Sequence, residues 1–130
     1  MNVELETELL ADMEDDWMSF WGFHTIVSSL TPEPVSPEDT ARVIETLLRR
    51  GLITLGQLAW NDVGREVWDV PPGVAMERIR YGHNGKHGYA SAPSWEHLMT
   101  TEVMRADLTP LGEERLTELA SSERPVNPVQ

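Results

Sequence analysis

The chain has 130 residues and no cysteine, and its 22 Asp and Glu against 10 Lys and Arg give a net charge of -12. This length suits one domain with a sizeable core, and the lack of cysteine excludes disulfides, a thiolate nucleophile and cysteine-ligated zinc. No apolar run approaches the roughly 18–20 residues that span a bilayer, and the acidic N-terminus does not resemble a secretory signal. We therefore expect a cytoplasmic protein that makes no contact with a membrane.

Negative charge is concentrated at the start of the chain. Residues 1–41 contain ten acidic side chains and no Lys or Arg, whereas residues 42–93 contain seven basic and five acidic side chains. An acidic surface repels phosphate backbones and attracts basic partners, although its commonest role is to keep a protein soluble. The composition therefore favours a protein partner with a basic surface over nucleic acid.

Residues 4–14 predict an amphipathic helix with a solvated acidic face. Leu5, Leu9 and Met13 recur at helical spacing and are expected to hold the helix to the core. The acidic side chains of the opposite face are Glu4, Glu6, Glu8, Asp12 and Glu14. From this face we select three candidates for partner binding, which are Glu4, Glu8 and Asp12.

A short extended piece at residues 17–18 leads into a second predicted helix. Ser19 is a suitable N-cap for a helix over residues 20–30, and the prolines after it make residues 31–35 a loop. His24 falls on the buried side of this helix, where we expect a core histidine that is satisfied by one hydrogen bond.

The sharpest local signal lies at the start of a third helix. Ser36 is an N-cap residue, Pro37 suits the first helical position, and two acids follow near the positive end of the helix dipole. The helix is predicted to run to residue 50 and to stop at Gly51. Its buried stripe is expected to contain Ala41, Ile44, Leu47 and Leu48.

A β-hairpin is predicted from two apolar runs, residues 52–55 and 67–68, that flank the turn-prone residues 61–64. Gly56 is interpreted as the mark of a β-bulge. Trp60 stands beside the turn and is the tryptophan that we most expect to be exposed. Because tryptophan is enriched at the energetic centres of interfaces, Trp60 is a further candidate for partner binding.

Helical segments are predicted in the second half of the chain. A short helix after two prolines ends near residue 81, and the glycine-rich residues 82–88 form a flexible loop. Ser94 can cap a helical turn, although residues 94–108 as a whole fit either helix or strand.

Thr109 and Pro110 are expected to open a last helix, which runs through Leu119. Residues 121–130 are polar and include two prolines, so we expect a disordered tail there. The sequence has no internal repeat and no dividing linker, so residues 1–120 are predicted to form a single domain.

The order helix, short strand, helix, helix and hairpin resembles a winged helix-turn-helix domain. The run Leu-Leu-Arg-Arg-Gly-Leu-Ile at residues 47–53 looks like a third helix leading into the first wing strand, and residues 61–64 would be the wing tip. The Leu-Thr-Pro-Leu-Gly step at residues 108–112 resembles one that often opens a helix after the wing. The resemblance covers residues 5–68 and this step, and it implies an α+β fold with a winged-helix-like three-helix core, a β-hairpin and an additional C-terminal helical portion. Some forty residues between Trp68 and Leu108 are not needed by the basic fold.

The same resemblance implies an alternative function, a transcriptional regulator whose third helix enters the major groove of DNA. The side chains that would contact DNA are Thr40, Arg42, Thr46 and Arg49 on that helix and Arg65 in the wing. These include only three cations, whereas useful affinity requires several neutralised phosphates. Nucleic acid is therefore a possible partner that the net charge disfavours.

Candidate sites for catalysis are sparse. His83 and His87 are the closest histidine pair, and a hydrolase or metal site at this loop is a third hypothesis, although no Cys, Asp or Glu lies between them and two ligands are fewer than zinc requires. The chain has neither a Gly-x-Ser-x-Gly turn nor a phosphate-binding loop. We expect no enzyme activity and no cofactor. The predicted function is binding of a protein partner through the acidic helix or the hairpin that carries Trp60.

Overall fold

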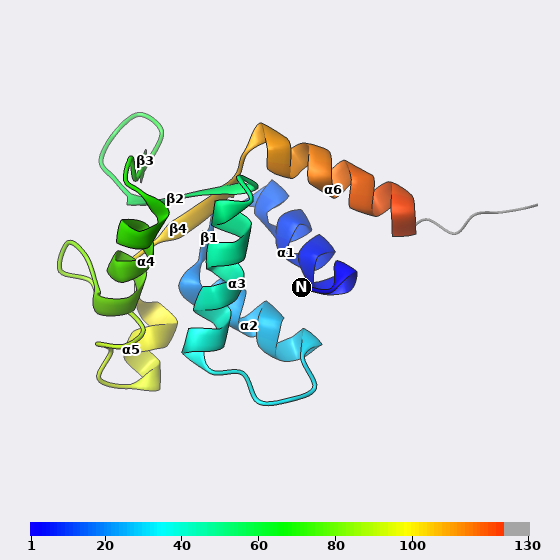
Figure 1. Ribbon diagram of the computed structural model, residues 1–130. Helices are drawn as coiled ribbons and strands as arrows, with labels where there is room; N and C mark the ends of the chain where they lie inside the picture. The colour runs from blue at the N-terminus through cyan, green and yellow to red at the C-terminus, as the bar shows by residue number, and fades with distance from the viewer. Residues whose placement is uncertain (124–130) are drawn as a thin grey trace, which may run out of the picture.

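The computed structural model describes residues 1–123, which form six α-helices and four β-strands (Figure 1). The helices are α1 (Val3–Asp15), α2 (Phe20–Leu30), α3 (Pro37–Arg49), α4 (Pro72–Tyr81), α5 (Trp95–Thr100) and α6 (Pro110–Glu123). The strands are β1 (Met18–Ser19), β2 (Ile53–Leu58), β3 (Arg65–Val67) and β4 (Arg105–Leu108). The fold is α+β, with a helical core, a hairpin and a C-terminal helical portion, as the sequence predicts. In the described part of the chain, no helix has the length and apolar character needed to cross a membrane.

The first helix buries one face and exposes an acidic one, as predicted. Asn2 caps α1, because its side-chain oxygen accepts a hydrogen bond from the Leu5 amide at 2.7 Å. The apolar side chains that α1 buries in the core are Leu5, Leu9, Leu10 and Met13. The exposed acidic side chains include Glu4, Glu8 and Asp12.

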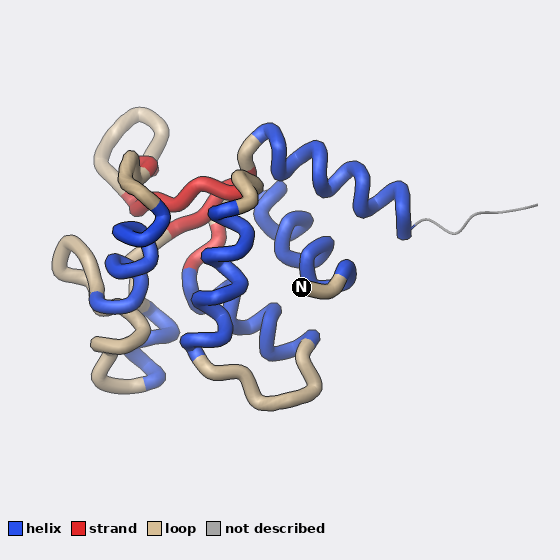
Figure 2. Tube along the Cα trace, in the orientation of Figure 1, coloured by secondary structure: helices blue, strands red, loops and turns tan. Residues whose placement is uncertain are grey.

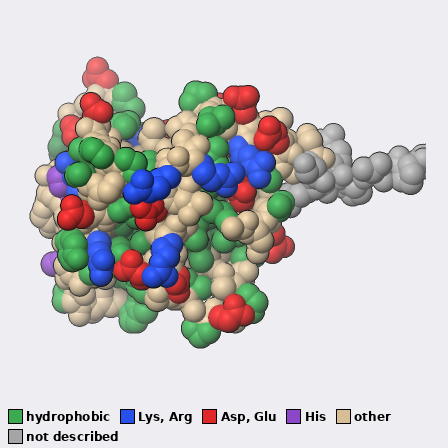
Figure 3. All heavy atoms as spheres, viewed as in Figure 1, with side chains coloured by type: hydrophobic (Ala, Val, Ile, Leu, Met, Phe, Trp, Pro, Cys, Tyr) green, Lys and Arg blue, Asp and Glu red, His purple; other side chains and the backbone are tan. Residues whose placement is uncertain are grey.

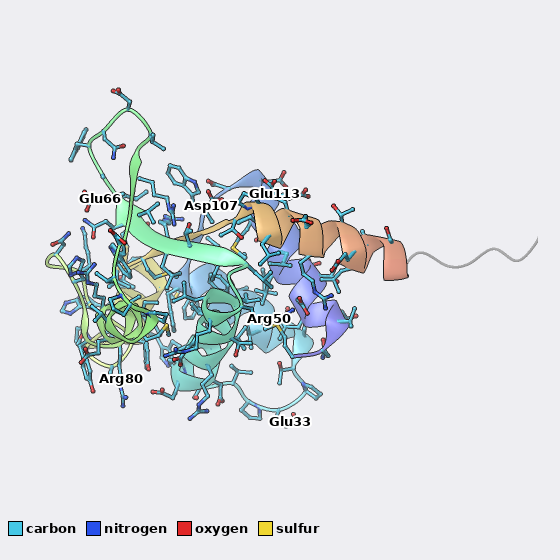
Figure 4. The ribbon with its side chains drawn as sticks, turned by 45° about the horizontal axis from the view of Figure 1, so that its top comes forward. Glu33, Arg50, Glu66, Arg80, Asp107 and Glu113 are labelled. Carbon is cyan, nitrogen blue, oxygen red and sulfur yellow. The ribbon has the colours of Figure 1, made fainter. Side chains whose placement is uncertain are left out.

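Glu6 departs from the prediction that it belongs to the solvated face. The residue is 2 % exposed, and its carboxylate accepts hydrogen bonds from Arg115 at 2.7 Å and from Arg50 at 3.1 Å. The cause is tertiary: α6 packs along α1, and Figure 4 shows Arg50 at the end of α3 beside both helices. The pKa of Glu6 is held below its ordinary value, chiefly by the hydrogen bond from Arg115.

The caps predicted for α2 and α3 are confirmed. The Ser19 hydroxyl accepts a hydrogen bond from the Gly22 amide at 3.2 Å. At α3, the Ser36 hydroxyl accepts from the Asp39 amide at 3.1 Å, and the Asp39 carboxylate accepts from the Ser36 amide at 3.0 Å, which completes a capping box. Gly51 follows the helix with a φ of 75°, a left-handed conformation that suits glycine.

The four strands form one antiparallel sheet in the order β1-β4-β2-β3, which lies between α4 on one side and α1 and α6 on the other (Figure 2). The predicted hairpin is β2 and β3, and β4 lies between β1 and β2. The predicted bulge at Gly56 is wrong, because the pairing with Val67 and with Arg105 continues one residue against one residue through this position. Gly56 is needed for a different reason: a Cβ atom there would collide with the carbonyl oxygen of Glu66.

The ambiguous segment 94–108 contains both a helix and a strand. Ser94 caps α5, with its hydroxyl accepting from the His97 amide at 3.3 Å, and β4 follows four residues after α5 ends. The predicted helix before residue 81 is α4, which buries Ala75 and Ile79 and packs beside α3. α4 thus adds a helix next to the third helix, and α5 contacts α2.

Residues 83–86 form an ordered turn within the segment predicted as a flexible loop. The backbones of His83 and Lys86 exchange two hydrogen bonds, at 3.1 and 2.9 Å. Asn84 and Gly85 between them have φ angles of 50° and 78°. Positive φ at both central residues is typical of a type I′ turn, for which Asn-Gly is the preferred pair. The sequence signal was therefore present, and the flexible-loop interpretation missed it.

Thr109 joins the last helix to the end of the third. Its amide donates to the Leu52 carbonyl at 3.0 Å, and its hydroxyl donates to the Gly51 carbonyl at 2.6 Å and accepts from the Gly112 amide at 3.0 Å. α6 then packs on α1 and continues to Glu123, so the first three residues of the predicted tail are helical. The rest of that tail lies outside the described residues.

Candidate functional site

The turn between β2 and β3 presents the most exposed large apolar side chain in residues 1–123. Trp60 is fully exposed, at 106 % relative accessibility, in agreement with the expectation from the sequence. The backbone around it is held by hydrogen bonds, because the Ala59 amide donates to the Gly64 carbonyl at 3.0 Å. The Asn61 side chain accepts from the Gly64 amide at 2.6 Å and donates to the Arg65 carbonyl at 3.1 Å. The indole is therefore presented to solvent on an ordered turn.

Other apolar side chains of the same hairpin are also exposed. They are Leu58 at 45 %, Val63 at 71 % and Val67 at 52 %. A single exposed aliphatic residue is ordinary in a soluble protein, but a group of them on one short hairpin is typical of an interaction surface. We call Leu58, Trp60, Val63 and Val67 the apolar hairpin.

A groove of about 450 Å³ separates this hairpin from the turn at residues 83–86. Its lining includes Leu58, Trp60 and Val103 on the apolar side and Asn84 and Lys86 on the polar side. Leu58 and Trp60 come from the β2–β3 hairpin and Asn84 and Lys86 from the turn at residues 83–86, and each turn is closed by its own hydrogen bonds, whereas Val103 comes from the segment between α5 and β4. The groove is therefore bounded by backbone segments with a defined shape.

The base of the groove is fixed by aromatic and polar contacts. The His83 ring meets the Trp68 ring edge to face with centroids 5.5 Å apart, and the Trp68 indole N–H donates to Gln57 at 2.9 Å. Burial, followed by the positive charge of Arg78, lowers the pKa of His83, whereas Glu66 acts in the opposite direction. The His83 ring therefore tends toward its neutral form.

The acidic face of α1 forms a second, separate surface. Glu4, Glu8 and Asp12 recur one helical turn apart, and no ion pair involves them within residues 1–123. In Figure 1, α1 lies on the opposite side of α3 from the β2–β3 turn. The structure therefore does not bring the acidic candidates and Trp60 into one site.

Two of the residues predicted to contact DNA are buried, and for these the prediction is wrong. Thr40 has 0 % exposure, because α2 packs against α3, and its hydroxyl lies 2.7 Å from the His24 Nδ1 of α2. This contact also supplies the single hydrogen bond expected for the buried His24. Arg65 is 7 % exposed and reaches across the sheet, where its guanidinium donates at 3.1 Å to the carbonyls of Thr54 and Arg105.

The other DNA candidates are exposed on α3, but their charges are already paired. Arg42 lies 2.9 Å from Asp39, and Arg49 lies 2.8 Å from Glu45. The exposed Thr46 directs its hydroxyl to a carbonyl of its own helix at 2.9 Å. Figure 3 shows basic and acidic side chains side by side over this part of the surface, so the described residues here form no continuous basic stripe.

α4 further restricts the outer side of α3. A groove of about 370 Å³ runs between the two helices and is lined by Arg42 and Glu45 from α3 and by Glu77 and Arg80 from α4. A helix that reads the major groove must enter it with its outer face free. The neighbouring α4 and the acids between the arginines both oppose that use.

The histidines of the third hypothesis point to different neighbours. His83 packs against Trp68, whereas the His87 ring contacts that of His97 with centroids 5.5 Å apart. No group of three or more His, Cys, Asp or Glu suitable for a metal ion occurs in the described part of the chain. The geometry therefore adds no support to a metal or hydrolase site at this loop.

A comparison with known protein families, with curated proteins and with solved structures gives no match. Functional assignment consequently depends on the geometry and chemistry of the chain itself. Of the surfaces described above, the apolar hairpin and its groove combine exposed apolar area, an ordered backbone and an open concave shape.

Proposed function

We propose that this chain is a non-catalytic, cytoplasmic domain that binds a protein partner through the apolar hairpin. The observation that carries the proposal is the full exposure of Trp60 on a turn whose backbone is closed by hydrogen bonds. Tryptophan is among the residues that contribute most to interface energy, and a preordered turn loses little conformational entropy on binding. Burial of an exposed indole on such a turn therefore contributes favourably to the free energy of binding a partner.

The acidic face of α1 has a supporting role in this proposal. Glu4, Glu8 and Asp12 are exposed and lie away from the hairpin, so they act on approach and orientation rather than on the central contact. Charges outside the core of an interface chiefly change the association rate and its salt dependence. The partner that fits both surfaces has a basic region and an apolar pocket for the indole.

For the fold we propose a winged-helix-like core in which β2 and β4 form the wing, in place of the hairpin at residues 52–68 that the sequence suggested, so that residues 59–104 are an insertion. Two observations support this assignment: β4 lies between β1 and β2, so that β2 and β4 occupy adjacent central places, and the Leu-Thr-Pro-Leu-Gly step begins at Leu108, the last residue of β4. The insertion contributes β3, α4 and α5. It adds Trp60, Val63 and Val67 of the apolar hairpin and also places α4 beside α3, which favours protein contact over DNA recognition.

DNA binding remains the alternative function, with Arg42, Thr46 and Arg49 as its exposed candidates. The pairing of both arginines with acids and the position of α4 make it the less favoured proposal. Only α3 would take part, because Arg65 is buried away from any DNA backbone.

The proposed function is tested by comparing proteins captured from the native host on the wild-type chain, on Trp60→Ala and on a matched control. Tyr81→Ala is the control, since Tyr81 is an aromatic side chain of 59 % exposure on a different element. We expect Trp60→Ala to lower the affinity for the captured partner at least about thirtyfold, which corresponds to about 2 kcal/mol of binding free energy. Tyr81→Ala should bind as the wild type does. An unchanged affinity for Trp60→Ala would refute the proposal.

A further inference from the structure

Among the side chains that line the groove beside the apolar hairpin, one positive charge has no ion-pair partner within residues 1–123. Glu102 lines it, but both carboxylate oxygens accept hydrogen bonds from Arg105, at 2.6 and 2.8 Å. Glu66 lies near His83 but is not among the residues that line the groove. Lys86 is the only lysine of the chain and forms no ion pair within residues 1–123.

The apolar side of the same groove can accept a hydrophobic group. Leu58 and Val103 line it beside Trp60, and the volume of about 450 Å³ is within the range of about 300–1,000 Å³ that ligand pockets occupy. Lys86 and Asn84 belong to the type I′ turn on the facing side, whose backbone is closed by two hydrogen bonds. An occupant therefore meets an apolar wall on one side and a cation with an amide on the other.

We propose that this groove binds the C-terminal residue of a partner polypeptide, with an apolar side chain against Leu58 and Trp60 and the terminal carboxylate beside Lys86. The proposal rests on the protein-binding role of the hairpin and names the chemistry that the partner brings to it. The Asn84 side chain offers a second donor to the same carboxylate. A hydrogen bond to a carboxylate is stronger when its donor is charged than when its donor is neutral.

The openness of the site favours a polypeptide end over a free small acid. Binding sites for small molecules cover most of the ligand surface, whereas Trp60 at the edge of this groove is fully exposed. A polypeptide continues beyond its last residue and can cover the indole and Val63 as it leaves the groove. The terminal residue then supplies the specific contact, and the preceding residues supply the apolar area.

The test uses three probes: the acetylated peptide Gly-Ser-Gly-Phe as the free acid, the same peptide as the C-terminal amide, and 3-phenylpropanoate. Each is titrated into the full ¹⁵N-labelled chain, and shifts are followed at the amides of residues 57–60 and 83–86 and at the indole N–H of Trp60. We expect the free acid to bind about tenfold more tightly than the amide, because only the acid pairs with Lys86. The small acid should bind more weakly than the peptide.

Two variants isolate the contribution of the charge. Lys86→Gln should remove the preference for the free acid while leaving amide binding unchanged. Because the Lys86 side chain is exposed, this substitution should leave the fold intact. Arg49→Gln removes a cation outside the groove and should leave the preference intact.

Four results would overturn the proposal: no shifts at millimolar peptide, shifts outside the two turns, equal binding of acid and amide, or a small acid that binds as tightly as the peptide. These results are independent of the proposed protein-binding function. If Trp60→Ala still loses a captured partner while the peptides fail, the hairpin role stands and the C-terminal specificity falls. If the peptides bind as expected while Trp60→Ala retains every partner, the C-terminal specificity of the groove stands and the proposed role of Trp60 in partner binding falls.

Discussion

Two surfaces of the molecule differ in how far their side chains are already satisfied. Around α3 and at the α1–α6 contact, the exposed Arg42 and Arg49 each have a carboxylate partner, and the buried Glu6 has two arginine partners. At the groove between the apolar hairpin and the turn at residues 83–86, Trp60 is fully exposed and Lys86 has no ion-pair partner within residues 1–123. Paired charges gain little from a new contact, whereas the hairpin gains apolar burial and charge pairing together. Recognition is therefore expected where the surface is unsatisfied, and stability where it is paired.

Removal of Glu6, the buried carboxylate with two arginine partners, is expected to have the largest effect on stability. We expect Glu6→Ala to lower the free energy of unfolding by about 2–3 kcal/mol, since Arg50 and Arg115 lose their common partner and the α1–α6 contact loses its polar centre. Both arginines are partly exposed, which keeps the loss below that of a fully buried pair. Urea denaturation measures the change. Glu8→Ala is the matched control and should cost less than about 0.5 kcal/mol, so equal losses would contradict the assignment.

The pH dependence of stability sharpens the same point. The hydrogen bond from Arg115 holds the folded pKa of Glu6 below its ordinary value of 4.5. A carboxyl with a lowered folded pKa stabilises the fold fully above its unfolded pKa, and this contribution is lost as the pH falls through the folded pKa. Between pH 6 and pH 3, Glu6→Gln should therefore lose less stability than the wild type. Parallel urea midpoints over this range would show that Glu6 is not the titrating group.

Reversal of charge on α1 tests whether the acidic face assists the hairpin. With the partner captured through Trp60, Glu4→Lys, Glu8→Lys and Asp12→Lys together should slow association and flatten its salt dependence, because exposed charges act mainly on the on-rate. Each exposed change should alter stability by no more than about 0.5 kcal/mol. Reversal of the exposed Glu33, Glu77 and Glu96 gives the same change in net charge on other elements. Equal slowing by both sets would leave α1 with no specific role.

The smallest expected effect concerns DNA and the paired arginines of α3. Random-sequence duplex at low salt should bind no more tightly than about 10⁻⁵ M, because few phosphates can be neutralised. Arg42→Gln with Arg49→Gln should therefore change binding little in a gel-shift or anisotropy assay. Submicromolar affinity with a steep salt slope, lost in this double variant, would reverse the comparison and make α3 the recognition surface.

Short-range signals were sufficient to predict most elements of this chain. The Ser19 and Ser36 caps bond to amides three residues away, and Gly51 ends α3 through its own φ angle, so each signal is contained in a few adjacent residues. The exposure of Trp60 followed in the same way from its place beside a turn. The Asn84-Gly85 turn was equally local, and its preference for positive φ could have been recognised from the sequence.

Only the tertiary structure decided which polar side chains are covered. Glu6 was assigned to the solvated face of its helix, but its partner Arg115 is 109 residues away, and Thr40 is covered by His24 of another helix. Arg65 is buried because the chain returns as β4 and offers the Arg105 carbonyl to its guanidinium. The periodicity of a segment shows which stripe faces the core, but it contains no information on which distant element packs against the flanks of that stripe. The sequence by itself thus determined most of the helices, the caps of α2 and α3, and the exposed indole, whereas packing between distant segments determined the partners of the buried polar groups and the groove beside Trp60.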